Sequence, residues 1–350
     1  MLAVTPTGPA GAGAGTTRGT RTTTTTTPDP CSGAPATVAA QQVAFADLAA
    51  SGGGWSTADG YVPVPLPDHR TAWLMSDTLL AAAPTFVHNS IVVQRGHCFT
   101  PLLGGNAETR DDLVPSVDGR ACWQSAGVAQ GSTLTVFCTE VERADGSPGF
   151  GFQVTGTALA TFALPGLTFT GRAPLPFIEP AGIRWGTGAV LDHDWVYVYG
   201  VATGAQYVAR VRFDRLTTGP WRFWTGHAWG ARDALVPMTF AHATPALPAF
   251  VTPTPHGFVA VAFASPLPDP TIGGWTSTAP QGPWRPLGTV ATASTAPGQY
   301  AYDARAVDLG RAGWAVVYNV NDPVAVTTDP AAYGARFVSL RNGVRRRSPR

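Results

Sequence analysis

Five apolar segments of similar pattern recur along the chain at a nearly constant interval, which limits the folds that the chain can adopt. Each follows a turn sequence and a shorter apolar strand, and most are followed by a third strand, such as NSIVVQ after residue 88. Four antiparallel strands in about 60 residues are typical of one blade of a β-propeller. The segments are AWLMSD from residue 72, LTVFCT from 134, WVYVYG from 195, FVAVAF from 258 and WAVVYN from 314, so their starts lie 62, 61, 63 and 56 residues apart.

This spacing predicts an all-β fold, a five-bladed β-propeller over residues 39–341. Two face-to-face sheets are the main alternative, but a sandwich does not explain the even interval. The stretch 37–49 is expected to add a strand to the last blade and close the ring. Residues 1–38 are rich in Thr, Gly and Pro, and we expect them to be disordered because they cannot bury enough apolar surface. Residues 342–350 are expected to form an exposed basic tail.

The composition agrees with many turns and excludes several kinds of function. The chain has 40 Gly and 32 Pro, and only 13% of its residues are charged, against roughly 25% in an average domain. All 23 cationic residues are Arg, which excludes Schiff-base chemistry and a phosphate loop that needs a lysine. Because the net charge is +1 and no Arg stripe alternates with aromatics, no nucleic-acid partner is expected. No cofactor is implied.

The N-terminal segment and the four cysteines favour a secreted or cell-surface protein. Segments like residues 1–38 often link a secretion signal to a folded domain, although no signal peptide is visible in the chain. No apolar run reaches the 18 or so residues of a membrane span. Cys31, Cys98, Cys122 and Cys138 lack the spacing of a zinc site, and the His residues form no ligand-spaced pair. We therefore expect no metal, and we expect structural disulfides or inert thiols, with three possible pairings open. A monomer is also expected.

Two of the 22 acidic residues stand at the same end of one predicted hairpin. Asp59 precedes its first strand and Asp77 closes its second, so that Asp59 should face about Thr78 and Asp77 about Gly60. Cross-strand neighbours lie about 5 Å apart and diagonal ones about 7–8 Å. Two carboxylates at that range repel each other, so one pKa should rise while the other group stays anionic. Glycoside hydrolysis needs such a division. Either Asp alone is more often a turn residue, and it is the convergence of both at a channel mouth that favours the functional interpretation.

In a propeller, the start of strand one, the end of strand two and the start of strand three of each blade meet beside the central channel. In the first repeat the start of strand three holds His88 and Asn89. Aromatic residues at the other positions could stack on sugar rings, but they are as often ordinary core residues. The equivalent positions in the other repeats hold Trp123, Glu140, Trp185, Tyr302, Asp303, Arg305 and Asn319.

Several segments together resemble a known family. DGYVPVPLPDHRTAWLMSDT, FVHNSIVVQ, WGTGAVLDHDWVYVYG, WRFWTG, GPW and YNVN resemble secreted, mostly actinobacterial five-bladed propellers that were long filed as a domain of unknown function. That group includes endo-D-arabinanases, which cut the D-arabinan of mycobacterial cell walls. The likeness spans roughly residues 40–341, and it implies that the acids of the DG and DT elements, Asp59 and Asp77, are the catalytic pair.

The chain departs from this family pattern at three places. It has SDT where the family commonly has GDT, and CWQSAG where the second blade usually has an element like WPGDG with an acid. The last blade keeps Arg305 without the His that often follows it. The missing acid of the second blade puts the activity or its specificity in doubt.

The leading hypothesis is a secreted glycoside hydrolase that acts on a furanoside polysaccharide, D-arabinan first, through Asp59 and Asp77. The expected partner is thus a polysaccharide or oligosaccharide. The alternative is a carbohydrate-binding propeller at the cell surface that has no catalytic activity. A sialidase is disfavoured because its S-x-D-x-G-x-T-W repeats are absent. The substrate-binding candidates are His88, Asn89, Trp123, Glu140, Trp185, Asp303, Arg305 and Asn319.

Overall fold

The computed structural model describes residues 30–81, 86–144, 151–176, 182–241, 248–264, 270–326 and 329–341. The chain divides into two compact units, residues 1–30 and residues 31–350, and the described helices and strands belong to the second. The basic tail expected at 342–350, and most of the segment 1–38 that was expected to be disordered, lie outside the described residues. No helix in the described ranges is long and apolar enough to cross a membrane.

Five antiparallel sheets follow one another along the chain, and each has one of the five repeated segments as its second strand. The first sheet is β2 (Val62–Pro65), β3 (Thr71–Met75), β6 (Ser90–Arg95) and β7 (Cys98–Leu102), and the second is β10 (Ala121–Gln130), β11 (Thr133–Arg143), β12 (Phe152–Ala163) and β13 (Thr168–Pro174). The third is β14 (Arg184–Asp192), β15 (Trp195–Ala202), β16 (Ala205–Arg212), β17 (Arg222–Trp224) and β18 (Trp229–Gly230). The fourth is β19 (Phe250–Thr254), β20 (Gly257–Phe263), β21 (Thr271–Ser277) and β22 (Arg285–Thr292), and the last is β23 (Tyr300–Asp308), β24 (Trp314–Asn321) and β25 (Tyr333–Ser339).

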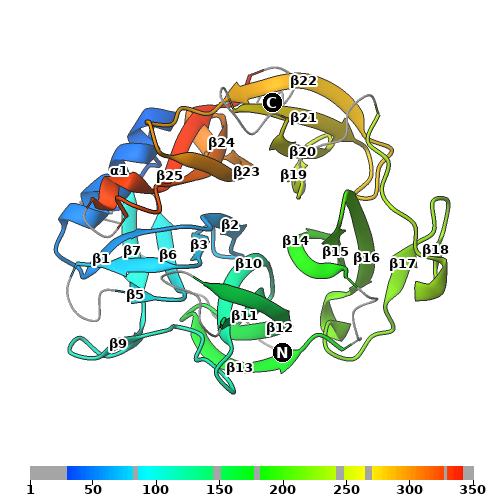
Figure 1. Ribbon diagram of the computed structural model, residues 1–350, viewed down its shortest axis with the longest axis horizontal. Helices are drawn as coiled ribbons and strands as arrows, with labels where there is room; N and C mark the ends of the chain where they lie inside the picture. The colour runs from blue at the N-terminus through cyan, green and yellow to red at the C-terminus, as the bar shows by residue number, and fades with distance from the viewer. Residues whose placement is uncertain are drawn as a thin grey trace, which may run out of the picture. The chain divides into compact units, whose positions relative to one another are not determined.

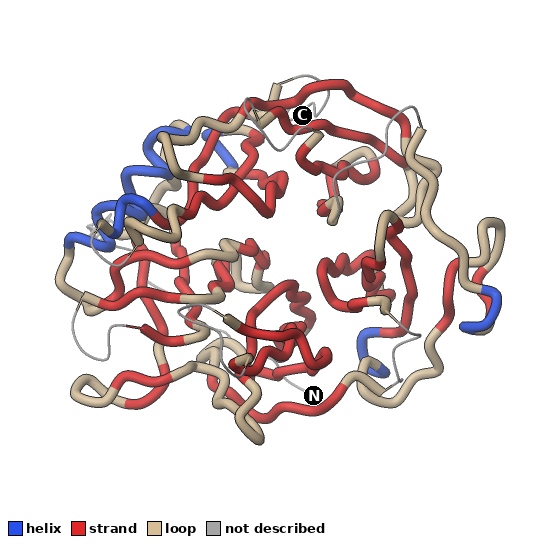
Figure 2. The backbone as a smooth tube through the Cα atoms, in the orientation of Figure 1, coloured by secondary structure: helices blue, strands red, loops and turns tan. Residues whose placement is uncertain are grey.

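Smaller elements complete the described chain. One small sheet joins β1 (Trp55–Ala58), β4 (Thr78–Leu80) and β5 (Phe86–Val87), and another pairs β8 (Gly104–Gly105) with β9 (Arg110–Asp111). The helices are α1 (Val38–Ala50) and the 3₁₀ turns η1 (Phe213–Arg215), η2 (Arg232–Ala234), η3 (Gly310–Ala312) and η4 (Pro330–Ala332). Strands make up most of the backbone, and the longest helix lies at the edge of residues 31–350 (Figure 2).

The five sheets surround a common centre (Figure 1). Their first strands β2, β10, β14, β19 and β23 contact one another in chain order and together line one cavity of about 570 Å³. An all-β, propeller-like fold was predicted from the repeat, and it is confirmed.

The core consists of apolar layers between neighbouring sheets. Strand β15 shows why the repeated segments are almost continuously apolar. Val196 and Val198 pack toward the second sheet, while Tyr197 and Tyr199 pack toward the fourth. A strand that is buried on both faces needs apolar residues at every position rather than at alternate ones.

The first and last sheets are joined by a helix, so the strand that was expected at 37–49 is wrong. Thr37 caps α1, because its side chain accepts a hydrogen bond from the backbone N–H of Ala40. Phe45 packs against Trp73 of the first sheet and Phe337 of the last, with ring centroids at 5.5 and 5.8 Å. The Gln42 side chain adds hydrogen bonds to the backbone of β25 at Ala335 and Phe337. The buried residues of this segment, Val38, Gln41, Phe45 and Leu48, therefore form one face of a helix that packs across the junction.

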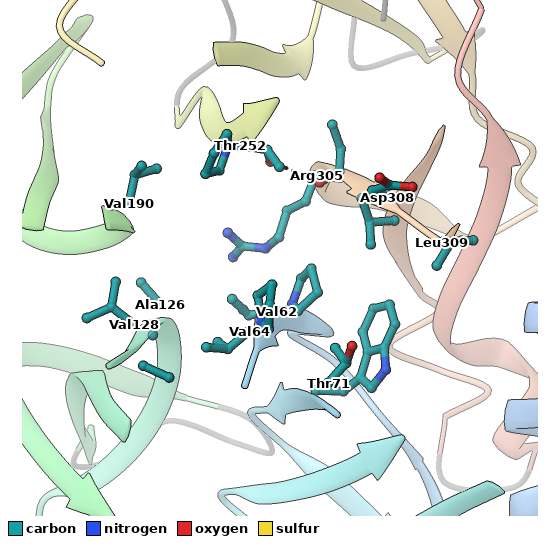
Figure 3. A pocket seen from close by; sticks show the side chains of 18 of the residues that line it. Val62, Val64, Thr71, Ala126, Val128, Val190, Thr252, Arg305, Asp308 and Leu309 are labelled. Carbon is teal, nitrogen blue, oxygen red and sulfur yellow. Dashed lines mark hydrogen bonds between the residues drawn. The ribbon is translucent and has the colours of Figure 1, made fainter. Parts of the chain in front are cut away.

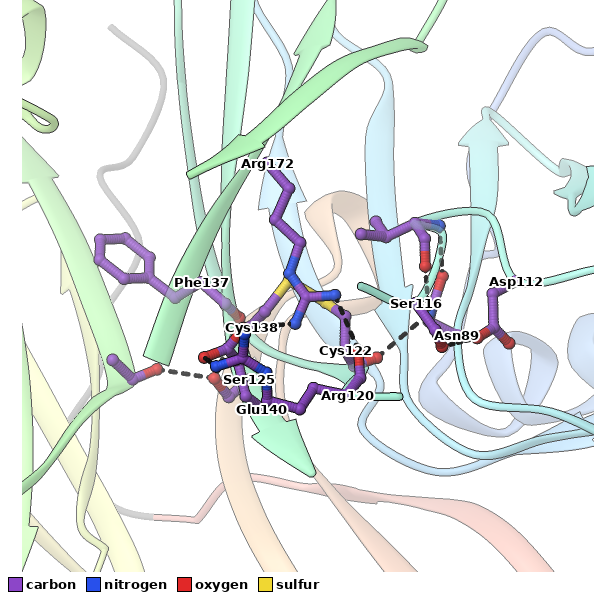
Figure 4. Close-up of a disulfide and its surroundings, with 12 residues drawn as sticks. Asn89, Asp112, Ser116, Arg120, Cys122, Ser125, Phe137, Cys138, Glu140 and Arg172 are labelled. Atoms are coloured by element: carbon purple, nitrogen blue, oxygen red, sulfur yellow. Dashed lines mark hydrogen bonds and ion pairs between the residues drawn. A yellow bond between two sulfur atoms is a disulfide. The ribbon is translucent and has the colours of Figure 1, made fainter. Parts of the chain in front are cut away.

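All four cysteines form disulfides. Cys31–Cys98 ties the segment before α1 to β7. Cys122–Cys138 links β10 to β11 within the second sheet (Figure 4). The sequence left three pairings open, and the structure has this one.

Candidate active site

The two acids predicted as a pair stand opposite each other across the first hairpin. Asp59 lies in the gap between β1 and β2, directly after the end of β1, and Asp77 lies in the gap between β3 and β4, directly before the start of β4. The backbone N–H of Asp59 donates to the carbonyl of Asp77, and the N–H of Ser76 donates to the carbonyl of Asp59, both at 3.0 Å. Thr78 pairs with Ala58, so the expected register was wrong by about one residue, and the acids are closer in register than expected.

A glycine allows this close approach. Gly60 has φ +91°, and a Cβ at that position would lie 3.0 Å from the backbone nitrogen of Ser76. Only glycine adopts this conformation without strain and leaves room for the neighbouring strand. The next residue, Tyr61, also has a positive φ, of 43°. The interruption between β1 and β2 therefore brings Asp59 beside Asp77.

Equivalent interruptions occur in the first strands of three other sheets. The register shifts between Gln124 and Ala126 in β10, between Trp185 and Gly188 in β14, and between Tyr302 and Arg305 in β23. A β-bulge re-aims the side chains next to it. The positions that were aligned from the sequence with Asp59 therefore coincide with these bulges or lie next to them.

The Asp59 carboxyl lies in a largely dry environment. Its Oδ2 accepts a hydrogen bond from the Tyr302 hydroxyl at 2.9 Å, while its Oδ1 is buried without a hydrogen-bond partner among the described residues. The pKa of Asp59 is raised to about 7, because burial and, to a smaller extent, the charge of Asp303 outweigh the hydroxyls of Tyr302 and Tyr333, which lower it. Desolvation favours the neutral form of a carboxyl, so Asp59 can hold a proton near neutral pH.

Asp77 has different hydrogen-bond partners. Its Oδ1 accepts from the indole Nε1–H of Trp123 at 2.6 Å, and the Tyr333 hydroxyl donates to its backbone carbonyl at 3.2 Å. Burial, and then the charge of Asp59, raise the pKa of Asp77 well above its usual value, while Trp123 and His88 lower it. Because each carboxylate opposes ionisation of the other, the pair titrates as a unit. Such a pair carries an acid and a base at the same time.

His88 places an imidazole close to the pair. Its backbone N–H donates to Oδ1 of Asp112 at 2.6 Å, and its Nδ1 lies 3.2 Å from Oδ2 of the same carboxylate. The hydrogen bond to Asp112 raises the pKa of His88, and the charge of Asp77 adds to this. The imidazole is 44% exposed, so it can reach a ligand as well as stabilise an anionic Asp77.

Arg305 and Asn319 are buried polar residues of the last sheet. The Arg305 guanidinium points into the central cavity (Figure 3), where it lies 3.6 Å over the Phe250 ring and 3.7 Å from Asp303. Burial lowers the pKa of Arg305 to about 10. The amide of Asn319 is 1% exposed and has no hydrogen-bond partner among the described residues. Neither Asp59 nor Asp77 lines the cavity, but the charge of Asp59 acts on Arg305, which does.

Comparison with known proteins assigns the family. The model of a domain of unknown function, DUF5005, matches residues 42–320. The chain belongs to the DUF5005 family. No curated protein matches this DUF5005 chain.

Solved structures share its fold at low sequence identity. A Bacteroides ovatus protein provisionally described as a hydrolase has a TM-score of 0.65 and 16% identity, over 84% of this chain and 88% of that one. The GH43_1 enzyme of Xanthomonas citri, solved with xylotriose, has a TM-score of 0.50 and 14% identity, over 84% and 92% of the two chains. At such identities the likeness extends to the fold only.

Three of the predicted substrate-binding residues of this DUF5005 chain make internal contacts instead. Trp185 is fully buried and packs against Phe223, which leaves no ring face for a sugar. The Asn89 amide is also fully buried and hydrogen-bonded to the backbone at Val114 and Cys122. Glu140 forms an ion pair with Arg172 at 2.7 Å (Figure 4). These contacts organise the second and third sheets and the loop that leads to them.

Two residues of this DUF5005 site were missed in the sequence. Tyr333 begins β25, the third strand of the last sheet, and the rule that strand-three starts meet at the channel would have found it. No pattern in the sequence around Asp112 indicates a role in the site, because Asp112 reaches His88 from a loop 24 residues further along the chain. In the described part of the chain, no group of three or more His, Cys, Asp or Glu side chains could hold a metal ion.

Proposed function

We propose that this DUF5005 protein is a secreted, five-bladed glycoside hydrolase that cleaves a furanoside polysaccharide, D-arabinan first. The observation that carries the proposal is the pair Asp59 and Asp77, two carboxyls at one strand interruption whose pKa values are both raised. Five sheets that each contain one repeated segment support the count of five blades. The two disulfides support secretion, because such bonds persist in oxidising compartments.

Hydrolysis of a glycosidic bond needs a proton on the leaving oxygen and a base or nucleophile at the anomeric carbon. A pair with one protonated and one ionised carboxyl supplies both. The neutral carboxyl donates its proton to the leaving oxygen as the carbon–oxygen bond breaks. The ionised one either takes a proton from the attacking water or bonds to the carbon itself, and His88, when protonated, stabilises its charge.

Neighbouring aromatic residues fix the orientation of both acids. Tyr302 holds one oxygen of Asp59, and Trp123 holds one oxygen of Asp77. Hydrogen bonds of this kind keep catalytic groups in a productive geometry. A fold shared with a glycoside hydrolase that was solved with xylotriose is consistent with a sugar substrate, and the family resemblance of the DG and DT elements favours D-arabinan.

The test is release of oligosaccharides from mycobacterial arabinogalactan, followed by chromatography. We expect Asp59→Asn and Asp77→Asn to lower the rate at least about 100-fold, as for the loss of an acid or base. Asp68→Asn is the matched control, since Asp68 lies at the far turn of the same hairpin and bonds Arg70. If both active-site variants cleave at the wild-type rate, the proposed chemistry is wrong.

One observation favours the second candidate function, glycan binding without cleavage. In the second sheet, where the family pattern has an acid, this chain has Trp123 and Gln124, and the Trp123 indole occupies one oxygen of Asp77. Binding of arabinogalactan fragments by calorimetry, with no product after prolonged incubation, would establish that function instead.

A further inference from the structure

Two exposed aromatic side chains flank the carboxyl pair. Of the Phe, Tyr and Trp residues in the described ranges, only Phe152 and Tyr300 belong to the exposed class, at 46% and 43%. Each of these two rings therefore presents uncovered apolar surface to solvent. Phe152 begins β12 of the second sheet, and Tyr300 begins β23 of the last.

Each exposed ring contacts an aromatic residue that is hydrogen-bonded to one of the acids. The ring of Phe152 meets that of Trp123 edge-on with centroids 4.1 Å apart, and Trp123 donates to Asp77. The ring of Tyr300 lies 5.4 Å from that of Tyr302, which donates to Asp59. A single aromatic side chain, Trp123 or Tyr302, therefore connects each exposed ring to one of the two carboxyls.

The two rings are held in place on opposite sides of the first sheet. The second sheet contacts the first through β10 and β2, and the last sheet contacts the small sheet beside it through β25 and β1. Figure 1 shows the second and last sheets on either side of the first. The Asn321 amide donates to the Tyr300 hydroxyl at 3.1 Å. Val154, on the same face of β12 as Phe152, is also exposed, at 41%, and extends the apolar surface on that side.

We infer that Phe152 and Tyr300 are two sugar-binding platforms, one on each side of the bond to be cleaved. The apolar face of a sugar ring covers an exposed aromatic ring and removes it from water, while its hydroxyls stay hydrated. A glycan chain that covers both platforms passes over Asp59 and Asp77. Its length then decides binding, so long chains are cut internally and short ones bind weakly. This inference rests on the proposed function.

The test measures binding and product size for D-arabino-oligosaccharides of two to eight units prepared from mycobacterial arabinogalactan. Calorimetry on the Asp77→Asn background avoids turnover. We expect Phe152→Ala and Tyr300→Ala each to weaken binding of the eight-unit chain about tenfold, the order of one aromatic contact, and to leave binding of the two-unit chain unchanged. Phe152→Trp and Tyr300→Phe keep a ring and should keep the affinity. Val43→Ala, at an exposed position on α1, is the matched control.

The outcomes separate this inference from the proposed function. If the wild-type protein binds the long chain but never cleaves it, the hydrolase proposal fails. Binding by the two alanine variants then still shows whether Phe152 and Tyr300 are sugar-binding platforms. If the protein cleaves and the two alanine variants bind the eight-unit chain like the wild type, the platforms are refuted alone. Loss in only one variant refutes the two-sided arrangement. No binding of any chain length by the wild type overturns both.

Discussion

Replacing Asp59 by Asn should stabilise the folded protein above pH 5, although Asp59 belongs to the candidate active site. Burial raises the pKa of Asp59 from 3.8 to about 7. The folded state therefore keeps the proton between about pH 4 and 7, while the unfolded state has lost it. The free energy of unfolding of the wild type thus falls as the pH rises through this range. Because Asn carries no charge, the free energy of unfolding of the variant does not fall in this way as the pH rises.

The size of the effect follows from the shift in pKa. Each unit corresponds to about 1.4 kcal/mol, so a shift of about three units gives an upper limit of roughly 4 kcal/mol above pH 7. Asp59 keeps part of its surface open to solvent, which screens the charge, and we therefore expect about 2 kcal/mol. In the variant, the Tyr302 hydroxyl can donate to the oxygen of the new side-chain amide as it does to Oδ2 of the carboxyl.

Urea unfolding followed by tryptophan fluorescence at pH 4 to 8 measures this difference. The two proteins should be equally stable near pH 4 and should diverge as the pH rises. Asp68→Asn is the control: Arg70 lowers the pKa of the exposed Asp68, so that variant should lose a little stability above pH 4 rather than gain it. A difference between Asp59→Asn and wild type that stays constant from pH 4 to 8, or has the opposite sign, would refute the reasoning.

Three further predictions concern neighbouring groups. Trp123→Phe removes the donor to Asp77, so the pKa of Asp77 should rise further, and the acidic limb of the pH–rate profile should move to higher pH; an unchanged limb would exclude this role. Asp112→Asn removes the main cause of the raised pKa of His88, and NMR titration of that imidazole should show a lower pKa than in the wild type. Replacing Cys122 and Cys138 together by Ala removes a crosslink across a sequence separation of 16 and should lower the free energy of unfolding by about 3 kcal/mol, whereas a loss below about 1 kcal/mol would contradict that account.

The sequence predicts the sheets well because burial on both faces of a strand leaves a strong local pattern. The apolar run in β15 is of this kind. It predicts α1 poorly, since a short apolar segment fits a strand or a helix, although Thr37 as an N-cap was a usable signal. Trp123 and Trp185 occupy aligned positions, yet one reaches Asp77 and the other is buried beneath Phe223. That difference depends on residues far away in the chain.

The partners of Asn89 and Glu140 show the same limit. Asn89 binds the backbone of a loop 25 residues further on, and Glu140 pairs with Arg172, 32 residues away. Both are polar residues at the predicted channel positions, and only their tertiary contacts distinguish them from ligand-binding residues. Asp59 and Asp77 were predictable because a single hairpin brings them together.

The helix that joins the first and last sheets affects the order of events during synthesis. Gln42 in α1 is hydrogen-bonded to Phe337 in β25, 295 residues later. At the ribosome, α1 can pack early against Trp73 of the first sheet, but the surface that it shares with β25 has no partner until nearly all of the described chain has emerged. Nascent chains of this protein should accordingly leave the β25-facing surface of α1 exposed until late in synthesis, and chaperones that hold hydrophobic segments should bind there.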